Sequence, residues 1–468
     1  MKSFAVLIPE GLDIEDLVRV HSPNLDPEYL RYLIHLTLSQ IAFAYQDKDS
    51  KKPISFSDIT KVYKQIHSDD LLVSNPKHRK HIDFLRSEFF SYTRKKSRTR
   101  FKETTVSVFH SRCYIKGERP FSYKLNPIFL KQRLKVEYIT TPRVIKKIKD
   151  SFTTLPSVVS NGKYRFLGKF FDENRLKVNF DEAVCFCEER YLVHKDYAKY
   201  VNEFNQLVDL KNGCYKIYNV AESDGRLHSN ITKLPKVYRR FLTYDGKRLV
   251  EVDLSSSIIY FIAMLINNHI KVDNIHINFP IKSYYLLRFA KTLESLDMIE
   301  KELLEAKCVS GEFYELFISD FRSSFTWYKL RSMFKSVSND EFDGSHKQVR
   351  KIAKKYLLAM IFADVNSYKK VQDIFRVKFP SLLDLLILFK KKFGYKSLSY
   401  LLFQIESCLM LDKVARKFNA KYYRVAPIFS LHDCLITTVD YESQLEVILT
   451  EVFKEEFDVA PRVETAHW

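Results

Sequence analysis

The chain has 468 residues, of which 46% are hydrophobic and 14% aromatic, so an intrinsically disordered protein is excluded and about two to four structural units are expected. Only 10 glycines occur, and neither G-x-x-x-x-G-K-[ST] nor G-x-G-x-x-G is present, which argues against a turn-rich all-β fold and against a P-loop or Rossmann nucleotide site. The formal net charge of +19 predicts a polyanionic partner, because clustered Lys and Arg gain affinity by releasing counterions from phosphates.

Cysteine usage and hydropathy bear on the cellular compartment. The seven cysteines include no C-x-x-C pair, which favours a reduced protein without a structural zinc. We find no apolar run long enough for a bilayer span, and the apolar part of the opening MKSFAVLIPEGLD is too short for a signal peptide. We therefore expect a cytoplasmic protein that does not bind membranes.

The region up to about residue 75 is expected to be helical. Apolar residues recur at helical spacing from Asp26 to Tyr45, and a shorter helix is expected from Asp13 to Val20. The pairs Asp13-x-Glu15 and Asp26-x-Glu28 mimic an exonuclease motif, but both lie at expected helix starts, where the helix dipole favours acidic residues. Proofreading is therefore not expected.

Basic residues are interleaved with Phe and Tyr from Ser91 to Lys135, and a weaker basic stretch follows at Arg143. Such runs are usually solvated surface, but aromatic rings in this arrangement can stack on bases while Arg and Lys hold phosphates. The stretch is therefore a candidate nucleic-acid contact. The distribution of motifs places a domain boundary near residue 215, after a basic, mostly helical region at residues 1–215.

The stretch GKRLVEVDLSSSIIYFIAMLINN, residues 246–268, predicts a short strand that carries Asp253 at its end. From about Ser257 the apolar residues take helical spacing. A carboxylate where a strand gives way to a helix can face a cleft. Alternatively, Asp253 could cap the start of that helix.

A basic amphipathic helix is expected over SHKQVRKIAKKYLLAMIF, residues 345–362. Arg350, Lys354, Leu358 and Phe362 follow one another at intervals of four and form one stripe. The cationic end could hold a triphosphate, and the aromatic end, roughly 18 Å further along the axis, could pack against a base and sugar. A solvated basic face is the alternative.

The stretch PIFSLHDCLITTVD, residues 427–440, predicts a hairpin with His432 and Asp433 at its tip. Asp433 is either a turn residue or a metal ligand. Because Mg²⁺ takes only one or two protein carboxylates together with substrate phosphates, Asp253 and Asp433 would suffice. Two such ions, about 3.5–4 Å apart, can activate a 3′-hydroxyl and stabilise a leaving pyrophosphate, and Mn²⁺ is a possible substitute.

In order, spacing and residue type, residues 216–468 resemble the polymerase region of family A DNA polymerases and of the related single-subunit phage RNA polymerases. DGRLHSNITKLPKVYRR, from Asp224, resembles the T-G-R-L-S-S segment, and VDLSSSIIYFIAML resembles motif A, D-Y-S-Q-I-E-L-R-I-L-A-H-L. RKIAKKYLLAMIF resembles motif B, R-x3-K-x7-Y, and SLHDCL resembles motif C, V-H-D-E or I-H-D-S. FQIESCLMLDKV resembles the Q-G-T-A-A-D helix at Gln404, and APRVETAHW resembles the closing strand.

This resemblance implies an α+β fold, the right hand of palm, fingers and thumb, predominantly helical with an antiparallel palm sheet. The fingers would occupy approximately residues 270–400, the palm the rest of residues 216–468, and the thumb part of residues 1–215. By the same resemblance, the metal ligands would be Asp253 and Asp433, the nucleotide-binding residues Arg350, Lys354, Phe362 and Ile258, and the primer-template contacts Arg226, Gln404, Arg239 and Arg240, with His432 near the primer end.

Three positions depart from the family pattern. Ile258 stands where DNA-synthesising members carry a Glu that helps to exclude ribonucleotides, Phe362 replaces a Tyr, and Cys434 replaces Glu or Ser. The preferred sugar is therefore open. The bulky Ile258 could itself act as a steric gate.

The leading hypothesis from the sequence is a compact, template-directed nucleotidyltransferase: a DNA polymerase without proofreading that replicates a phage or mobile element from nucleoside triphosphates. Alternatives of the same fold are an RNA polymerase or primase and a terminal transferase. From a different class comes a non-catalytic replication initiator that binds DNA. A two-metal nuclease would need further carboxylates near Asp433.

Overall fold

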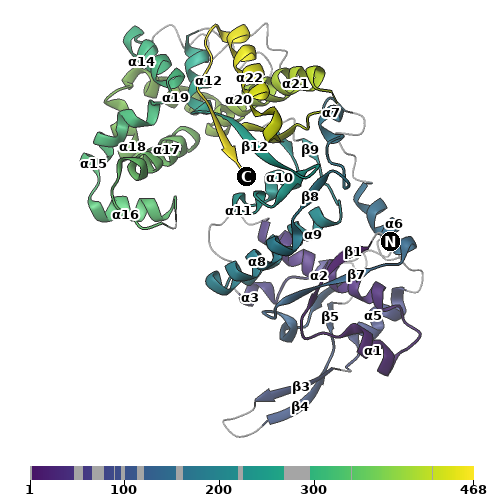
Figure 1. Ribbon diagram of the computed structural model, residues 1–468. Helices are drawn as coiled ribbons and strands as arrows, with labels where there is room; N and C mark the ends of the chain where they lie inside the picture. Colours follow the sequence, from purple (N-terminus) through teal and green to yellow (C-terminus); the bar gives the residue numbers. More distant parts are fainter. Residues whose placement is uncertain are drawn as a thin grey trace. The chain divides into compact units, whose positions relative to one another are not determined.

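The computed structural model describes residues 3–46, 56–65, 78–88, 90–95, 101–112, 121–153, 162–219, 225–267, 296–338, 340–423 and 425–468 (Figure 1). The chain forms two compact units: residues 1–217 with 229–246, called unit 1, and residues 218–228 with 247–468, called unit 2. Both combine helices with antiparallel strands, so the expected α+β class is confirmed.

Unit 1 contains most of the short strands. Its described helices are α1 (Ile14–His21), α2 (Pro27–Gln46), α3 (Phe56–Ile59), α5 (His78–Arg86), η1 (Pro127–Phe129), α6 (Pro142–Thr153), α7 (Arg165–Gly168), α8 (Phe180–His194), α9 (Tyr197–Lys211), α10 (Asn230–Lys233) and α11 (Lys236–Arg239). Its described strands are β1 (Phe4–Pro9), β2 (Lys64–Gln65), β3 (Phe90–Lys95), β4 (Phe101–Val106), β5 (Phe109–Arg112), β6 (Ser122–Leu125), β7 (Leu134–Ile139), β8 (Leu176–Val178) and β11 (Leu242–Tyr244).

Strand β1 lies in the core of unit 1. All of its residues are buried, it pairs with β7 in antiparallel register, and α2 and α9 pack against it. The Asn212 side chain forms hydrogen bonds of 2.8 Å with both the N–H and the carbonyl of Ala5. A side chain therefore pairs with the backbone groups of Ala5 on the edge of β1 that faces away from β7. The expectation of helix throughout the first 75 residues is therefore wrong at Phe4–Pro9. A short, fully buried apolar run does not reveal by its periodicity a strand partner far along the chain.

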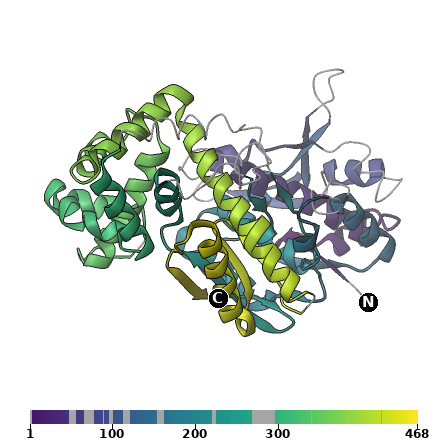
Figure 2. The same cartoon turned by 90° about the horizontal axis from the view of Figure 1, so that it is seen from above.

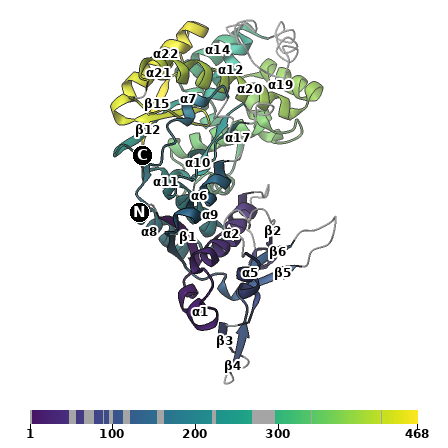
Figure 3. The ribbon, with the colours of Figure 1, turned by 90° about the vertical axis from the view of Figure 1, so that its right-hand side faces the viewer.

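Strands also occupy the basic and aromatic stretch of residues 91–135. The antiparallel pair β3 and β4 extends away from the other strands of unit 1 (Figure 1 and Figure 3). Phe109, Tyr123 and Phe129 are buried, whereas Phe121 is exposed. The idea that the aromatic rings of this stretch stack on bases is therefore wrong for the three buried rings, which stabilise the core of the unit instead.

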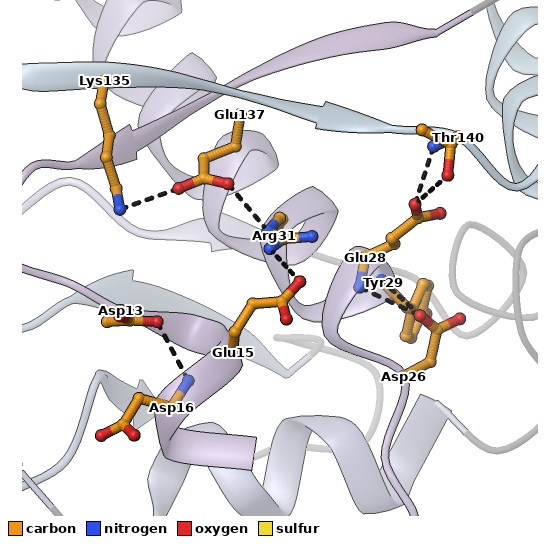
Figure 4. Close-up of polar contacts among 10 residues, drawn as sticks. All are labelled: Asp13, Glu15, Asp16, Asp26, Glu28, Tyr29, Arg31, Lys135, Glu137 and Thr140. Atoms are coloured by element: carbon orange, nitrogen blue, oxygen red, sulfur yellow. Dashed lines mark hydrogen bonds and ion pairs between the residues drawn. The ribbon is translucent and has the colours of Figure 1, made fainter. Parts of the chain in front are cut away.

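The acidic pairs at residues 13–15 and 26–28 serve the starts of two helices (Figure 4). Asp13 is the N-cap of α1 and accepts a hydrogen bond from the Asp16 N–H at 3.0 Å. Asp26 precedes α2 and accepts hydrogen bonds from the N–H groups of Glu28 and Tyr29 at 3.0 and 3.3 Å. The interpretation of both pairs as helix starts is confirmed, and it follows from the affinity of carboxylates for unpaired N–H groups.

Glu28 ties the start of α2 to the segment after β7 (Figure 4). Its carboxylate accepts hydrogen bonds from the backbone N–H of Thr140 at 2.8 Å, from the Thr140 hydroxyl at 2.6 Å and from the Thr141 N–H at 2.9 Å. Burial opposes ionisation, but these hydrogen bonds prevail and lower the pKa of Glu28 from its ordinary 4.5 to about 2. Because the folded-state pKa is the lower one, this contribution to stability is complete above the unfolded-state pKa and is lost as the pH falls toward 2.

We expect Glu28→Gln to lower the free energy of unfolding at pH 7 and to matter progressively less from about pH 5 downward, because the protonated glutamic acid resembles glutamine. Urea denaturation followed by circular dichroism at several pH values measures the difference. Glu10→Gln removes an exposed carboxylate of the same unit and is the control. A difference that stays constant between pH 7 and pH 3 would show that the charge of Glu28 is not its cause.

Unit 2 contains the residues of the predicted site. Its described helices are α12 (Ser257–Ile266), α14 (Met298–Val309), η3 (Phe313–Phe317), α15 (Ile318–Ser324), α16 (Trp327–Lys335), α17 (His346–Phe362), α18 (Lys369–Arg376), α19 (Pro380–Phe393), α20 (Tyr395–Ser407), the π-helical η4 (Cys408–Ala415), α21 (Arg416–Lys421), η5 (Val439–Tyr441) and α22 (Glu442–Phe457). Its described strands are β9 (Tyr218–Asn219), β10 (Leu227–His228), β12 (Lys247–Leu254), β13 (Phe429–Leu431), β14 (Cys434–Thr438) and β15 (Val463–His467).

An antiparallel sheet organises unit 2. Strand β12 lies between β14 and β15, and β13 pairs with the other side of β14. Helix α22 packs against β12 and β14, and α20, η4 and α21 follow one another without a break as the long yellow-green helix of Figure 2. Because β12 and β14 run in opposite directions, the carboxyl end of β12 meets the turn between β13 and β14 at one end of the sheet.

Candidate active site

Asp253 lies near the carboxyl end of β12, as the sequence predicts. The apolar residues of the strand are buried and hold it in the sheet, and α12 begins at Ser257. The N-cap of α12 is Ser256, so the alternative that Asp253 caps this helix is wrong. The Asp253 carboxylate instead accepts a hydrogen bond from the Leu254 N–H at 2.8 Å.

Asp433 lies at the tip of the β13–β14 hairpin, where Leu431 and Cys434 are cross-strand partners. The predicted hairpin is confirmed. His432 takes the left-handed conformation, with φ of 54°, which His tolerates better than most residues do. His432 is exposed and Asp433 is half-buried.

Strand pairing brings the two aspartates together. Asp253 and Cys434 are partners across β12 and β14, and neighbouring strands lie about 4.8 Å apart, so Asp433 sits one residue from the partner of Asp253. At the start of α12, the Ser257 hydroxyl donates a hydrogen bond to Asp433 Oδ2 at 3.3 Å. Burial, and next the charge of Asp433, raise the pKa of Asp253 to about 7. Two carboxylates in this arrangement repel each other, and a divalent cation would relieve the repulsion.

These two carboxylates fit a magnesium site. In the part of the chain that the structure describes, no group of three or more His, Cys, Asp or Glu side chains is arranged to hold a metal. Mg²⁺ does not require such a group, because it commonly takes one or two protein carboxylates and completes its octahedral shell with water and substrate phosphates. The donor set suits a metal that arrives with, or is shared by, a phosphate substrate.

Helix α17 carries two cations, Arg350 and Lys354, near the ring of Tyr314. The Arg350 guanidinium forms an ion pair with Glu315, and the charged groups of Arg350 and Lys354 lie 5.8 and 5.9 Å from the ring centroid of Tyr314. The positive charge of Lys354 opposes the rise in the pKa of Asp253, so the two groups interact electrostatically. Lys354 is exposed and acts electrostatically on Asp253, and Arg350 is held by Glu315, so the alternative of a purely solvated face is wrong for Arg350.

Tyr314 is a site residue that the sequence prediction missed. It lies in η3 and is almost fully buried. Burial raises its pKa, and the charges of Arg350 and Asp433 both act on its hydroxyl. Tyr314 therefore lies within electrostatic reach of both α17 and the hairpin tip. The aromatic run FYELF, residues 313–317, was its only signal, and such a run is typical of an ordinary hydrophobic core.

The two residues expected to face the nucleotide are not freely exposed. Ile258 is buried in the first turn of α12. Phe362, at the end of α17, is half-buried and packs against the ring of Phe403, with ring centroids 5.2 Å apart. The aromatic end of the α17 stripe thus contacts α20.

Arg226 and the helix α20 form a second polar group. Arg226 donates hydrogen bonds from Nε at 2.9 Å and from Nη2 to Glu406, and its guanidinium carbon lies 4.1 Å from the Phe403 ring centroid. Gln404 is only 1% exposed. Glu406 was missed by the sequence prediction, and the one signal for it was a lone carboxylate in the apolar run IESCLML.

Arg239 and Arg240 belong to unit 1, so they are not part of the polar group that Arg226 forms with α20 in unit 2. Arg239 Nε donates a hydrogen bond to the Leu234 carbonyl at 3.4 Å. Arg240 is exposed and lies over the Phe186 ring at 4.4 Å from its centroid.

Comparison with known proteins finds no matching family model and no matching curated protein. Among solved structures, 57 chains match, including the POL domain of Pol1 from M. smegmatis in complex with DNA primer-template and dNTP. The similarity to that domain has 12% sequence identity and a TM-score of 0.25, and it covers 69% of this chain and 65% of that chain. A TM-score this low leaves the geometry of the site as the evidence for function. None of the helices in the described ranges has the length and hydrophobicity needed to span a bilayer.

Proposed function

We propose that the protein is a template-directed nucleotidyltransferase, a DNA polymerase that extends a primer 3′-hydroxyl on a DNA template. The observation that carries this proposal is the pair Asp253 and Asp433 at one end of the sheet of unit 2, with Lys354 of α17 acting electrostatically on Asp253. Paired carboxylates with cations beside them suit a reaction whose substrate is a nucleoside triphosphate with its metal.

Each residue has a role in the proposal. Asp253 and Asp433 would hold two Mg²⁺ ions, or Mn²⁺ in their place, which supply activation of the hydroxyl and neutralisation of the phosphate charge. Lys354 and Arg350 bind the triphosphate, and Glu315 orients the Arg350 guanidinium. The 3′-hydroxyl loses its proton to water, its oxygen bonds to the α-phosphorus, the bond from that phosphorus to the bridging oxygen of the β-phosphate breaks, and pyrophosphate leaves.

In this proposal the sheet of β12 to β15 with α12 and α22 is the palm, α14 to α19 lie in the fingers, and part of unit 1 is the thumb. His432, exposed at the hairpin tip, lies near the primer end, and Arg226 contacts the primer-template. Gln404 is a weaker candidate for contact with the primer-template, because its side chain is buried. Arg239 and Arg240, which belong to unit 1, also contact the duplex in this proposal. A compact enzyme of this kind would serve the replication of a phage or mobile element.

Extension of a labelled primer on a DNA template in Mg²⁺ tests the function directly. Deoxynucleotides and ribonucleotides are offered separately, and parallel reactions omit the primer, the template or the metal. Templated extension with deoxynucleotides supports the proposal. Ribonucleotide use with or without a primer indicates an RNA polymerase or primase, template-independent addition indicates a terminal transferase, and duplex binding without any extension indicates a replication initiator.

We expect Ile258→Ala to raise the incorporation of ribonucleotides relative to deoxynucleotides by about tenfold or more, because the shorter side chain leaves room for the 2′-hydroxyl. The ratio of kcat/KM for the two sugars measures the effect. Ile259→Ala is the matched control, because it makes a similar cavity at the next buried position of α12. Equal ratios in both variants would show that Ile258 does not select the sugar.

A further inference from the structure

Glu406 is a carboxylate in an unfavourable place. It lies in the last turn of α20, is 0% exposed, and has apolar neighbours in sequence on the same helix, including Ile405 and Leu402, that are also buried. Removing a carboxylate from water is unfavourable unless a partner compensates its charge. Apolar residues of similar volume usually serve stability as well as a buried ion pair does. A buried pair at this position therefore points to a task other than stability.

The partner of Glu406 is Arg226, which lies far away in the sequence just before β10. The guanidinium donates from Nε and from Nη2 to the same carboxylate oxygen, Glu406 Oε1, and the ring of Phe403 packs against it. The Ser407 hydroxyl donates to the Gly225 carbonyl at 2.6 Å, so a second hydrogen bond joins the same two segments. The Arg226 guanidinium is thus held by a carboxylate and an aromatic face, and the residue before it is anchored to the same helix.

The two side chains of this ion pair differ in their exposure to solvent. The Arg226 side chain is 15% exposed, whereas that of Glu406 is 0% exposed. Arg226 therefore reaches the surface and Glu406 does not. The negative charges of Asp433 and Asp253 both act on Glu406, so the pair lies beside the end of the sheet that holds the two aspartates.

We infer that Glu406 is a positioning residue, whose buried carboxylate holds the Arg226 guanidinium in the orientation in which it contacts a nucleic-acid strand beside Asp253 and Asp433. The ligand is the backbone and sugar edge of a primer-template duplex, an assignment that rests on the proposed function. A planar guanidinium held at two points presents its donors in a fixed direction, which a lysine ammonium does not do.

Affinity for a fluorescein-labelled primer-template, measured by anisotropy in EDTA and without nucleotide, tests this inference independently of catalysis. We expect Glu406→Gln to weaken binding by about tenfold, the usual effect of losing a charge-assisted hydrogen bond. Arg226→Ala should weaken binding at least as much, and the double variant should bind no more weakly than Arg226→Ala, because Glu406 acts only through Arg226. Thermal midpoints are recorded for every variant.

Glu300→Gln is the matched control. Glu300 is also buried in unit 2, and its carboxylate accepts hydrogen bonds from the N–H groups of Ser381 and Leu382 at the start of α19, both at 3.0 Å. We expect this variant to lose thermal stability and to bind the duplex normally. If Glu406→Gln does not fold, Arg226→Lys replaces it, since it keeps the charge and removes the fixed guanidinium, and binding should weaken in the same way.

Three results would each overturn the inference. They are normal duplex affinity of Glu406→Gln, losses of affinity that add in the double variant, and normal duplex affinity of Arg226→Lys. If the unaltered protein extends primers while Glu406→Gln binds like Glu300→Gln, the inference fails and the proposed function stands. If the unaltered protein extends nothing but the two residues still show coupled duplex binding, the proposed function fails and the positioning role remains.

Discussion

Replacing Asp433 with Asn is expected to abolish primer extension, with a rate lower by about 10³-fold or more, because Asn cannot supply the charge that stabilises the reaction centre. The side chain keeps its size, and Ser257 can still donate its hydrogen bond, so the hairpin should fold. Addition of a single nucleotide to a labelled primer under single-turnover conditions measures the rate. Binding of the duplex in EDTA should be nearly unchanged.

Asp440→Asn is the control for this experiment. Asp440 follows β14, is exposed, and pairs with Lys247, so its loss removes a carboxylate close to the same hairpin without touching Asp253. We expect this variant to extend primers normally. Normal extension by Asp433→Asn would return Asp433 to the role of a turn residue.

Replacing Lys354 with Ala is expected to raise the KM for the nucleoside triphosphate by about tenfold or more, because a charge-assisted hydrogen bond to phosphate is lost. The value of kcat should also fall if the bond strengthens as charge develops on the leaving pyrophosphate. Steady-state insertion of one nucleotide at varied nucleotide concentration separates the two effects. The affinity for the primer-template should change little.

Lys355→Ala provides the comparison on the same helix. Lys355 donates to the Ser336 carbonyl, so it is held on another side of α17 from Lys354. Both variants remove one positive charge from the same turn. Equal increases in KM would mean that the general charge of the helix matters rather than the position of Lys354, and no increase in either would contradict a triphosphate site on α17.

The parts of the site that were predictable depend on local patterns. A run of β-branched and leucine residues ending in Asp253 predicts a strand end, and two such runs around His432 and Asp433 predict a hairpin. Intervals of four along residues 346–362 predict the basic stripe of α17. Each of these elements is formed by residues close in sequence, so its signal is contained within one segment.

Other parts depend on contacts between distant segments. Phe4–Pro9 is a strand because β7 pairs with it, and Phe109, Tyr123 and Phe129 are core because other elements cover them. Their composition alone is equally typical of a helix, a signal-like segment or an exposed aromatic face. Burial is a property of the assembled unit, so a local window does not contain it.

The amino-acid sequence by itself determined the strand that ends at Asp253, the turn that carries Asp433, the stripe of Arg350 and Lys354, and the caps at Asp13 and Asp26. Only the tertiary structure decided that Asp253 and Asp433 are neighbours, that Tyr314 lies close to both Arg350 and Asp433, and that Glu406 holds Arg226. The physical reason is the range of the forces. Turns, caps and periodicity act within a few residues, whereas strand register and the compensation of buried charge join residues that meet only when the chain has folded.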